Sequence, residues 1–548
     1  MSPAPVGSRG LSRAAGGVGL AVLGSRLLGL IREVVFTSLF GAGRELDAFI
    51  AAFRIPNLLR DLFAEGALSA AFVSTFSQKL EREGAESAWR LANRVLNDLA
   101  ALVGAIVVLG MIAAPWIVDW IAPGFRTDPG KAELTITLTR ILFPFLLLVA
   151  LAAVAMGVLN ARSVFLIPAS ASSFFNLGSI VGGLAFVQIL SPRYLAAVWS
   201  PLHGGAPPLP SETVSALIAM ACGTLAGGAL QLLVQVPALR RVGFSYRAIG
   251  GFRDPGVLQV LRLMGPATLG IAAVQINVVV NTYFASELGN GPVSWLNVAF
   301  RLMYLPIGMF GVALGTVALP AMARASARGD LESFRASLGE GLRLLLLLCL
   351  PAAAGLALLA EPIIALIYQH GRFVAADTHA AAVALAAYSL GLTGYAAIKI
   401  LGPAFYALDD ARTPMRVSLL SVAVNLACNW AATRLLGLGH GGLALSTSVV
   451  ALCNSALLFA LLARRVGGGA LGLGVEAARA LAATALMSAA CWLWLALLGA
   501  DGGFLRDLVR VTTTIALGLT TFYLAGRRLG LRDLERAGEL VRRRFAPR

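Results

Sequence analysis

Charge is scarce in this 548-residue chain. Only 13% of its residues are charged, whereas a soluble protein of this size carries about a quarter. Lysine occurs only at Lys79, Lys131 and Lys399, so the net charge of +16 comes almost entirely from arginine. No soluble basic domain exists to bind nucleic acid, and we expect no such partner. The excess of arginine fits instead the cytoplasmic loops of a membrane protein.

Residues that carry catalytic or metal chemistry are few and scattered. The five cysteines lie in apolar segments without metal-ligand spacing, and the four histidines show no ligand pattern. The sequence has no phosphate-binding GxxxxGK[ST] loop and no nucleophile–base constellation. We therefore expect no catalytic residues, no bound metal and no cofactor, in a protein that is not an enzyme.

Long apolar runs are abundant. Hydrophobic residues make up 58% of the chain, and many runs reach about twenty residues, the length at which a helix crosses the hydrocarbon core of a bilayer. The pattern predicts an all-α polytopic membrane protein with about fourteen transmembrane helices. Their expected ranges are 12–40, 45–78, 90–122, 132–160, 164–190, 212–241, 255–287, 293–323, 339–360, 377–408, 414–436, 441–464, 474–498 and 506–527.

The loops between these segments alternate in charge. One set is rich in arginine and includes residues 240–253 and the C-terminal tail, whereas the alternate loops, such as SPRYLAAVWSPLHGGAPPLP and ELGNGP, are poor in it. Since basic loops stay on the cytoplasmic side, we expect both termini in the cytoplasm. That orientation requires an even number of spans, in agreement with the predicted helices.

Three segments of the first half recur in the second half at an offset of about 250 residues. AAFRIPNLL matches VAFRLMYLP, APWIVDWIAPGF matches EPIIALIYQHGRF, and LNARSVFLIPASASSFFNLGSI resembles LDDARTPMRVSLLSVAVNLACN. The offset equals six predicted helices, so the repeats share one orientation and are related by a pseudo-two-fold axis along the membrane normal. We predict an N-lobe at 1–250, a C-lobe at 251–466, two extra helices at 467–530 and a basic cytoplasmic tail at 531–548.

Several predicted helices carry charges, each of which costs at least about 2.5 kcal/mol unless it faces a cavity or a partner. Arginine suits phosphate because its planar group donates two parallel hydrogen bonds and stays charged. We therefore predict a polar, anion-binding cavity between the lobes. Pairing or snorkelling is the alternative for any single residue. The charged positions are Arg26, Arg32, Glu33, Asp47, Arg54, Arg60, Asp61 and Glu65 in the first half, and Arg301, Arg372 and Lys399 in the second.

Amide and hydroxyl side chains suggest a second polar site. Asn425 and Asn429 lie four residues apart on one helix face, Thr447 follows in the next predicted helix, and Asn277 and Asn281 repeat the spacing. Their oxygens form a candidate Na⁺ site, and hydrogen bonding between helices is the alternative use.

Three long segments carry a family resemblance. SRLLGLIREVVFTSLFGAGRELDAFIAAFRIPNLLRDLFAEGALSAAFV, RLMYLPIGMFGVALGTVALP and GPAFYALDDARTP resemble the MurJ (MviN) family of lipid II flippases, part of the multidrug/oligosaccharidyl-lipid/polysaccharide exporter superfamily. The resemblance implies a bacterial inner-membrane protein that carries lipid II, an undecaprenyl-diphosphate-linked disaccharide-pentapeptide, to the outer leaflet by alternating access for peptidoglycan synthesis. It also implies that the two extra helices form a groove for the lipid tail.

The resemblance also implies roles for individual residues. Arg26, Arg32, Arg60 and Arg301 match the substrate-binding arginines of the family, and Asp47 and Glu65 match its acidic cavity and gate positions. We group Arg54, Arg372 and Lys399 with them as gate or supporting residues. The expected partners are lipid II and membrane lipids, with cell-wall synthesis enzymes as further candidates, and Na⁺ or the membrane potential is the candidate driving force.

The chain departs from the family pattern at several positions. Glu33 stands where Asp is frequent, Asp61 where some members have a basic residue, and Phe300 where some have Asp. The positions that match the sodium site of the family are Asn281, Asn425, Asn429 and Thr447, without a carboxylate, which leaves sodium coupling open. Alternative functions are export of another polyprenyl-linked glycan, drug/cation antiport and a non-transporting scaffold. An antiporter of cationic drugs would favour acids in the cavity, and a scaffold would need no arginines within the membrane.

Overall fold

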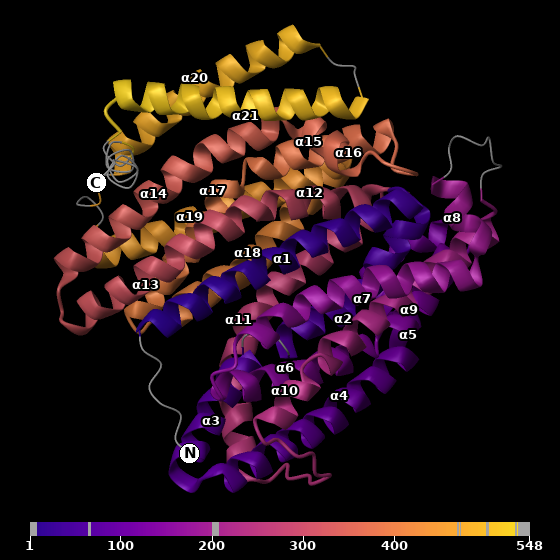
Figure 1. The fold of residues 1–548 in the computed structure, drawn as a ribbon. Coiled ribbons are helices and arrows are strands. Elements are labelled where there is room, and N and C mark those ends of the chain that lie inside the picture. Colours follow the sequence, from indigo (N-terminus) through magenta and orange to yellow (C-terminus); the bar gives the residue numbers. More distant parts are fainter. Residues whose placement is uncertain are drawn as a thin grey trace. The chain divides into compact units, whose positions relative to one another are not determined.

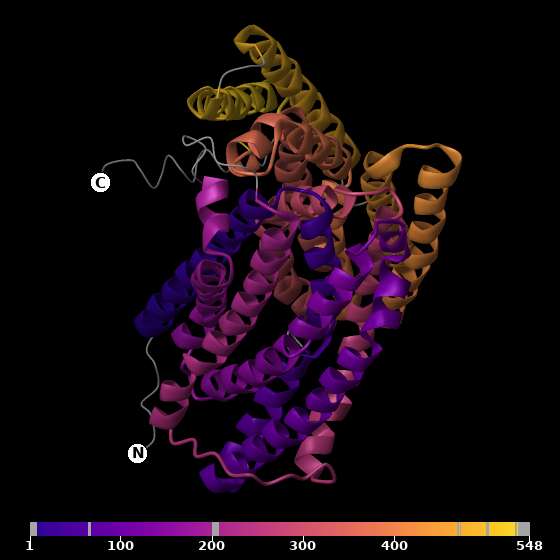
Figure 2. The ribbon, with the colours of Figure 1, turned by 90° about the vertical axis from the view of Figure 1, so that its right-hand side faces the viewer.

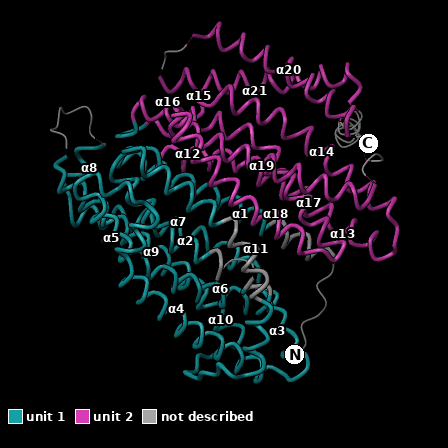
Figure 3. The backbone as a smooth tube through the Cα atoms, turned by 180° about the vertical axis from the view of Figure 1, so that it is seen from behind, with its two compact units in different colours: residues 1–293, 370–373 teal, residues 294–369, 374–548 magenta. Residues whose placement is uncertain are grey.

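The structure, a computed structural model, describes residues 8–63, 67–199, 208–467, 471, 473–499, 503–531 and 534. Within these ranges the regular elements are all helices and no β-strand occurs, which confirms the all-α prediction. Contacts divide the chain into two units (Figure 3). Unit 1 comprises residues 1–293 and the turn 370–373, and unit 2 comprises residues 294–369 and 374–548.

Unit 1 holds the helices up to α11. They are α1 (Ser8–Phe40), α2 (Arg44–Phe63), α3 (Ala67–Glu83), α4 (Ala85–Ile121), the 3-10 helix η1 (Pro123–Thr127), α5 (Lys131–Leu142), α6 (Phe145–Ala161), α7 (Leu166–Leu190), α8 (Pro192–Trp199), α9 (Pro210–Leu233), α10 (Val236–Arg241) and α11 (Pro255–Ser286).

Unit 2 begins within α12 and runs to the C-terminal helices. Its elements are α12 (Pro292–Pro306), the π-helix η3 (Ile307–Gly311), α13 (Val312–Ala327), α14 (Leu331–Leu358), α15 (Ala360–Tyr368), α16 (Ala375–Ser389), α17 (Leu392–Ala407), α18 (Arg412–Trp430), the π-helix η4 (Ala431–Leu435), α19 (Gly439–Val466), α20 (Leu473–Leu498) and α21 (Gly503–Arg528).

Each predicted segment coincides with one helix or with adjacent helices. The segment 377–408 is α16 and α17, which bend by 44° at their junction. Among the described residues, ten helices, or eleven if that bent pair is one span, are long and apolar enough to cross a membrane. The count of fourteen is therefore not confirmed. The helix α2 lies outside this set, and Asp47, Arg54 and Arg60 within it lower its hydropathy.

The contact units differ from the lobes predicted from the repeat. The helix α11, which the repeat places at the start of the C-lobe, packs against α2, α3 and α4 and belongs to unit 1. The repeat concerns the order of the helices along the chain, whereas the units reflect their packing. The lobe boundaries thus remain a prediction.

Glycines set the closest helix packing in unit 1. The helix α7 lies beside both α1 and α9 (Figure 1), and its contact with α9 is the most extensive among the described helices. A Cβ atom on Gly223 would lie 2.3 Å from the Cα of Gly183, and one on Gly227 would lie 2.4 Å from the carbonyl oxygen of Phe175. Only glycine allows the two backbones to approach so closely, as is usual for helices that pack in lipid.

Unit 2 ends in the two C-terminal helices, α20 and α21, which lie side by side (Figure 2). The helix α20 packs on α14, and α21 packs on α15. Their joint core contains Ala483, Met487, Cys491 and Phe522 together with Leu347 of α14. The two extra helices predicted at 467–530 are therefore present, and α14 anchors them to the rest of unit 2.

Candidate functional site

The first-helix arginines lie on α1, whose position α7 fixes. The Asn176 side chain of α7 donates a hydrogen bond to the carbonyl oxygen of Ser25, at 3.1 Å. The Arg32 guanidinium lies over the Phe175 ring, 4.9 Å from its centroid, and is half-buried, whereas Arg26 is exposed. A cation over an aromatic face is attracted by the ring quadrupole. Phe175 and Asn176 thus hold α1 and one of its predicted substrate arginines in place.

The predicted charges of α2 fall at different depths. Arg54 and Arg60 are both half-buried, and Asp47 at the start of the helix is fully buried. The Phe53 ring beside Arg54 packs on Phe145 at 5.1 Å between centroids. The Asp61 side chain and the whole of Glu65 lie outside the described residues.

A buried ion pair joins the start of α2 to the start of α5. Asp47 accepts hydrogen bonds from the Lys131 ammonium, at 3.2 Å, and from the backbone N–H of Gly291, at 2.7 Å. Lys131 also donates to the Asn290 side chain at 2.6 Å and lies 4.0 Å from the centroid of the Phe125 ring. Asp47 and Lys131 are 0% and 1% exposed. Asp47 therefore ties the loop before α12 to α2 and α5.

A second polar cluster surrounds the end of α1. The backbone N–H of Arg372 donates to the carbonyl oxygen of Ser38 at 2.8 Å, and the Tyr194 hydroxyl donates to that of Leu39 at 2.7 Å. The Arg372 guanidinium donates to the hydroxyls of Tyr194 and Thr213 at 3.2 and 3.4 Å. Burial raises the pKa of Tyr194, which keeps its hydroxyl a proton donor. Arg372 thus lies in hydrogen-bond contact with the end of α1, and its role as a gate or supporting residue stays a prediction.

In unit 2, the predicted cations lie on α12 and α17. Arg301 and Lys399 are both half-buried. The Phe300 ring beside Arg301 contacts three tyrosine rings, with centroid distances of 6.0, 5.5 and 6.1 Å to Tyr304, Tyr388 and Tyr395. At the Lys399 carbonyl, α13 passes so close that a Cβ on Gly315 would lie 2.2 Å from it.

The candidate ion-site residues are divided between the units. Asn425 and Asn429 of α18 are buried and their side chains meet at 3.4 Å, and Thr447 is buried on the neighbouring α19. Asn281 belongs to α11 in unit 1. The described residues contain no cluster of three or more His, Cys, Asp or Glu side chains that could hold a metal ion. The amide and hydroxyl residues of unit 2 form a polar patch, and their use for Na⁺ stays a prediction.

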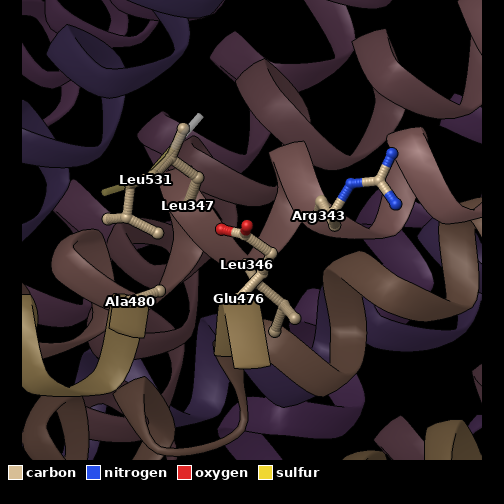
Figure 4. Close-up of a pocket in the computed structure, with 6 residues that line it drawn as sticks. All are labelled: Arg343, Leu346, Leu347, Glu476, Ala480 and Leu531. Atoms are coloured by element: carbon tan, nitrogen blue, oxygen red, sulfur yellow. The ribbon is translucent and has the colours of Figure 1, made fainter. Parts of the chain in front are cut away.

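An apolar pocket of about 580 Å³ lies between α14, α17, α19 and α20. Leu345, Leu401, Phe459 and Ala477 are among the residues that line it. A smaller pocket next to it shares Leu346 and is bordered by Arg343 and Glu476, which point in different directions (Figure 4). The Arg343 guanidinium donates to the carbonyl oxygen of Leu471 at 3.2 Å. The larger pocket suits an apolar chain.

Several residues that contact the predicted site residues carry no signal in the sequence that would identify them. In the sequence Lys131 is distinctive only as one of three lysines, but its burial with Asp47 makes it the counter-ion of a predicted gate residue. Tyr194 lies in α8, within a loop for which no helix was expected. No local pattern identifies Phe175 as the ring beneath Arg32, because the two residues are far apart in sequence. The rarity of lysine was the one available signal.

Comparison with known proteins gives consistent matches over most of the chain. The family model described as "Lipid II flippase MurJ" matches residues 36–509. The lipid II flippase MurJ of Burkholderia cenocepacia is 38% identical over 445 residues, which cover 80% of this chain and 81% of that protein. A probable lipid II flippase MurJ of Vibrio cholerae is 34% identical and covers 79% of each chain.

Solved structures show the same fold. A lipid II flippase MurJ in an inward closed conformation has a TM-score of 0.73 at 24% identity, covering 93% of this chain and 99% of that one. An inward-facing multidrug transporter of the MATE family has a TM-score of 0.64 at 15% identity, covering 82% of this chain and 96% of that one. At these identities the structural likeness concerns the fold alone.

Proposed function

Since the chain belongs to the MurJ family of lipid II flippases, we propose that it carries lipid II from the cytoplasmic to the outer leaflet of the bacterial cytoplasmic membrane. It acts by alternating access, without covalent chemistry, and supplies peptidoglycan synthesis. The apolar helices support a multi-pass membrane protein. The alternation of basic and non-basic loops supports the placement of both termini in the cytoplasm.

The arginines of α1 and α2 carry the proposal within this chain. Arg32 is fixed against Phe175, and Arg60 is half-buried in α2. A diphosphate offers oxygens that accept paired hydrogen bonds from a guanidinium, which stays protonated throughout transport. We assign headgroup binding to Arg26, Arg32, Arg60 and Arg301. Asp47, Arg54, Glu65, Arg372 and Lys399 support these residues or gate their access.

The lipid tail needs an apolar path, because a polyprenyl chain gains nothing from water or charge. The pocket of about 580 Å³, which the start of α20 helps to line, supports a tail site in unit 2, and α21 packs beside α20. Na⁺ bound near Asn281, Asn425, Asn429 and Thr447, or the membrane potential, would drive transport. Membrane lipids surround the helices, and cell-wall synthesis enzymes are proposed as downstream partners.

Substitution of the four arginines tests the proposal. We expect Arg→Ala variants at these sites to fail to complement a flippase-depleted strain and to lose lipid II accessibility at the outer face, while the protein remains in the membrane at wild-type amount. The matched control is Arg193→Ala, because Arg193 is an exposed arginine of α8 outside the proposed site. The variants are Arg26→Ala, Arg32→Ala, Arg60→Ala and Arg301→Ala.

Normal growth of cells whose flippase lacks all four arginines would overturn the proposal. Transport of cationic drugs with no change in lipid II exposure would identify an antiporter instead. Exposure of a different polyprenyl-linked glycan at the outer face would identify another exporter.

A further inference from the structure

The segment between α10 and α11, residues 242–254 and here named the linker, has its backbone held by side chains of α4. The Asn93 side chain donates to the carbonyl oxygen of Ser245 at 3.0 Å and accepts from the N–H of Arg247 at 2.7 Å. One turn further along α4, the Asn97 side chain donates to the carbonyl oxygens of Arg247 and Ile249 at 2.8 and 3.0 Å. The two amides thus bind the non-helical backbone of the linker through its N–H and carbonyl groups.

The end of the linker is fixed by two carboxylates. Asp98 of α4 is 5% exposed and accepts from the N–H of Gly251 through both of its oxygens, at 3.0 and 3.1 Å. Asp254 forms an ion pair with Arg94 and accepts from the N–H groups of Gly256 and Val257 at the start of α11. The linker is therefore held along α4 at several points, and its acidic residue, Asp254, already forms an ion pair with Arg94.

Fixing the backbone leaves the arginines and two aromatic side chains of the linker exposed, whereas the third aromatic ring, that of Phe244, packs on Trp89 of α4 at 5.8 Å between centroids. Tyr246 and Phe252 are 61% and 52% exposed, although the Tyr246 hydroxyl donates to the Asn97 side chain of α4 at 2.9 Å. Arg247 and Arg253 are exposed beside them. Arg240 and Arg241, exposed at the end of α10, extend this surface. In the described part of the chain, these four arginines form no ion pair. We name the four arginines together with Tyr246 and Phe252 the linker surface.

We propose that the linker surface docks onto anionic phospholipid headgroups of the cytoplasmic leaflet. Basic residues next to a transmembrane helix are attracted by the negative surface potential of that leaflet, and tyrosine and phenylalanine rings are suited to the headgroup region. Guanidinium groups pair with phosphate in two parallel hydrogen bonds. Because α4 already orders the backbone, docking costs little further conformational entropy. The proposal rests on the cytoplasmic placement of this loop and not on the identity of the transported substrate.

Lipid selectivity of the full-length protein tests the proposal without lipid II. The protein is placed in phosphatidylcholine bilayers with trace spin-labelled phosphatidylglycerol or phosphatidylcholine, and the association constants of the two labels are compared. We expect wild type to prefer phosphatidylglycerol by about fivefold or more. A variant that lacks the linker arginines should lose most of this preference. Its substitutions are Arg240→Gln, Arg241→Gln, Arg247→Gln and Arg253→Gln.

A matched control removes the same number of exposed arginines from other basic loops and should keep the preference. Its substitutions are Arg324→Gln, Arg328→Gln, Arg412→Gln and Arg416→Gln, at positions that are all exposed. If both variants lose the preference for phosphatidylglycerol equally, net charge alone explains the preference and the proposal is overturned. An unchanged preference in the linker variant, or loss in the control alone, would overturn it as well.

Two further measurements distinguish binding to a lipid surface from binding to a soluble phosphate. Inorganic diphosphate should leave the preference for phosphatidylglycerol unchanged, and full competition would identify a phosphate site instead. A dye attached to Phe252→Cys, in a chain whose native cysteines are replaced, should be quenched by lipids brominated near the headgroup. Absence of quenching would place the linker surface away from the membrane and overturn the proposal.

Discussion

The repeat contains the FR element in two copies, Phe53–Arg54 in α2 and Phe300–Arg301 in α12, and we call these two helices the FR helices. Each FR helix is linked to a neighbouring helix, but by different interactions. In unit 1, Asp47 lies seven residues before Arg54 and pairs with Lys131 at the start of α5. In unit 2, Ser294 occupies the position seven residues before Arg301 and is fully buried. There the neighbouring Trp295 makes the link instead, since its indole N–H donates to Asp377 at the start of α16, at 3.1 Å.

The helices that receive these links follow matching turns, APGF before α5 and HGRF before α16. Both copies therefore join the FR helix to the helix after the turn. Unit 1 uses two charges that are almost fully buried, and unit 2 uses a neutral donor to a half-buried carboxylate. A repeat can thus preserve a link between two helices, here called a joint, while the residues that form the link change. The difference also predicts that the joint of unit 1 is more sensitive to substitution.

Loss of Lys131 should give the largest effect. Lys131→Met leaves the Asp47 carboxylate buried without its cation, and breaking a buried pair from one side costs about 3–5 kcal/mol. We expect a correspondingly large fall in the free energy of unfolding in detergent. Asp47→Asn combined with Lys131→Met should recover at least half of the loss, because no buried carboxylate remains. A double variant as unstable as the single one would contradict the account of Asp47 and Lys131 as a pair.

Glycine contacts allow the same comparison at the helix interfaces. Gly227→Ala in unit 1 would place a Cβ 2.4 Å from the Phe175 carbonyl oxygen, and Gly315→Ala in unit 2 would place one 2.2 Å from that of Lys399. Both neighbours are backbone atoms of a packed helix, so we expect each variant to lose about 1–3 kcal/mol of unfolding free energy. Thermal unfolding measures the effect. The control is Gly104→Ala, which meets no atom within 4 Å and should be neutral or stabilising.

The neutral joint of unit 2 should tolerate substitution better. Trp295→Phe removes the indole donor to Asp377, which still accepts from the backbone N–H of Val374 at 3.2 Å. The loss of one hydrogen bond predicts a decrease of about 1 kcal/mol in unfolding free energy. The measurement is the same unfolding assay that is used for Lys131→Met. If Trp295→Phe and Lys131→Met lose the same free energy of unfolding, the two joints contribute equally to stability and the expected difference between them is wrong.

Much of this comparison could be predicted from the sequence. The repeat aligned Arg54 with Arg301 and the two turns with each other, and apolar runs located the helices because burial in lipid requires them. The partners of Asp47 and Trp295 could not be predicted, since each lies more than eighty residues away and three-dimensional packing brings them together. The same holds for Arg32 over Phe175. The residues of the site were visible in the sequence, but most side chains that hold them were not.

Another pair of matching turns in the repeat differs in its titratable groups. LNARS in unit 1 has Asn160 at its second position, whereas LDDART in unit 2 has Asp409 and Asp410. Asp410 accepts from the Thr413 hydroxyl at 2.6 Å and from the N–H groups of Thr413 and Arg412, and it lies 2.9 Å from Arg465. The hydrogen bond from Thr413, first of all, holds the pKa of Asp410 below its ordinary value.

A carboxyl group whose pKa is lower in the folded state releases its proton more readily there than in the unfolded chain. Its stabilisation is complete above the ordinary aspartate pKa of about 3.9 and is lost as the pH falls through the folded value. Asp410→Asn should therefore lower the unfolding temperature at pH 6, and the difference from wild type should shrink below about pH 4. Asn160→Ala in the matching turn should change the unfolding temperature equally at both pH values. If Asp410→Asn lowers the unfolding temperature equally at both pH values, the charge of Asp410 adds nothing to stability. The loss then reflects only hydrogen bonds that asparagine does not form.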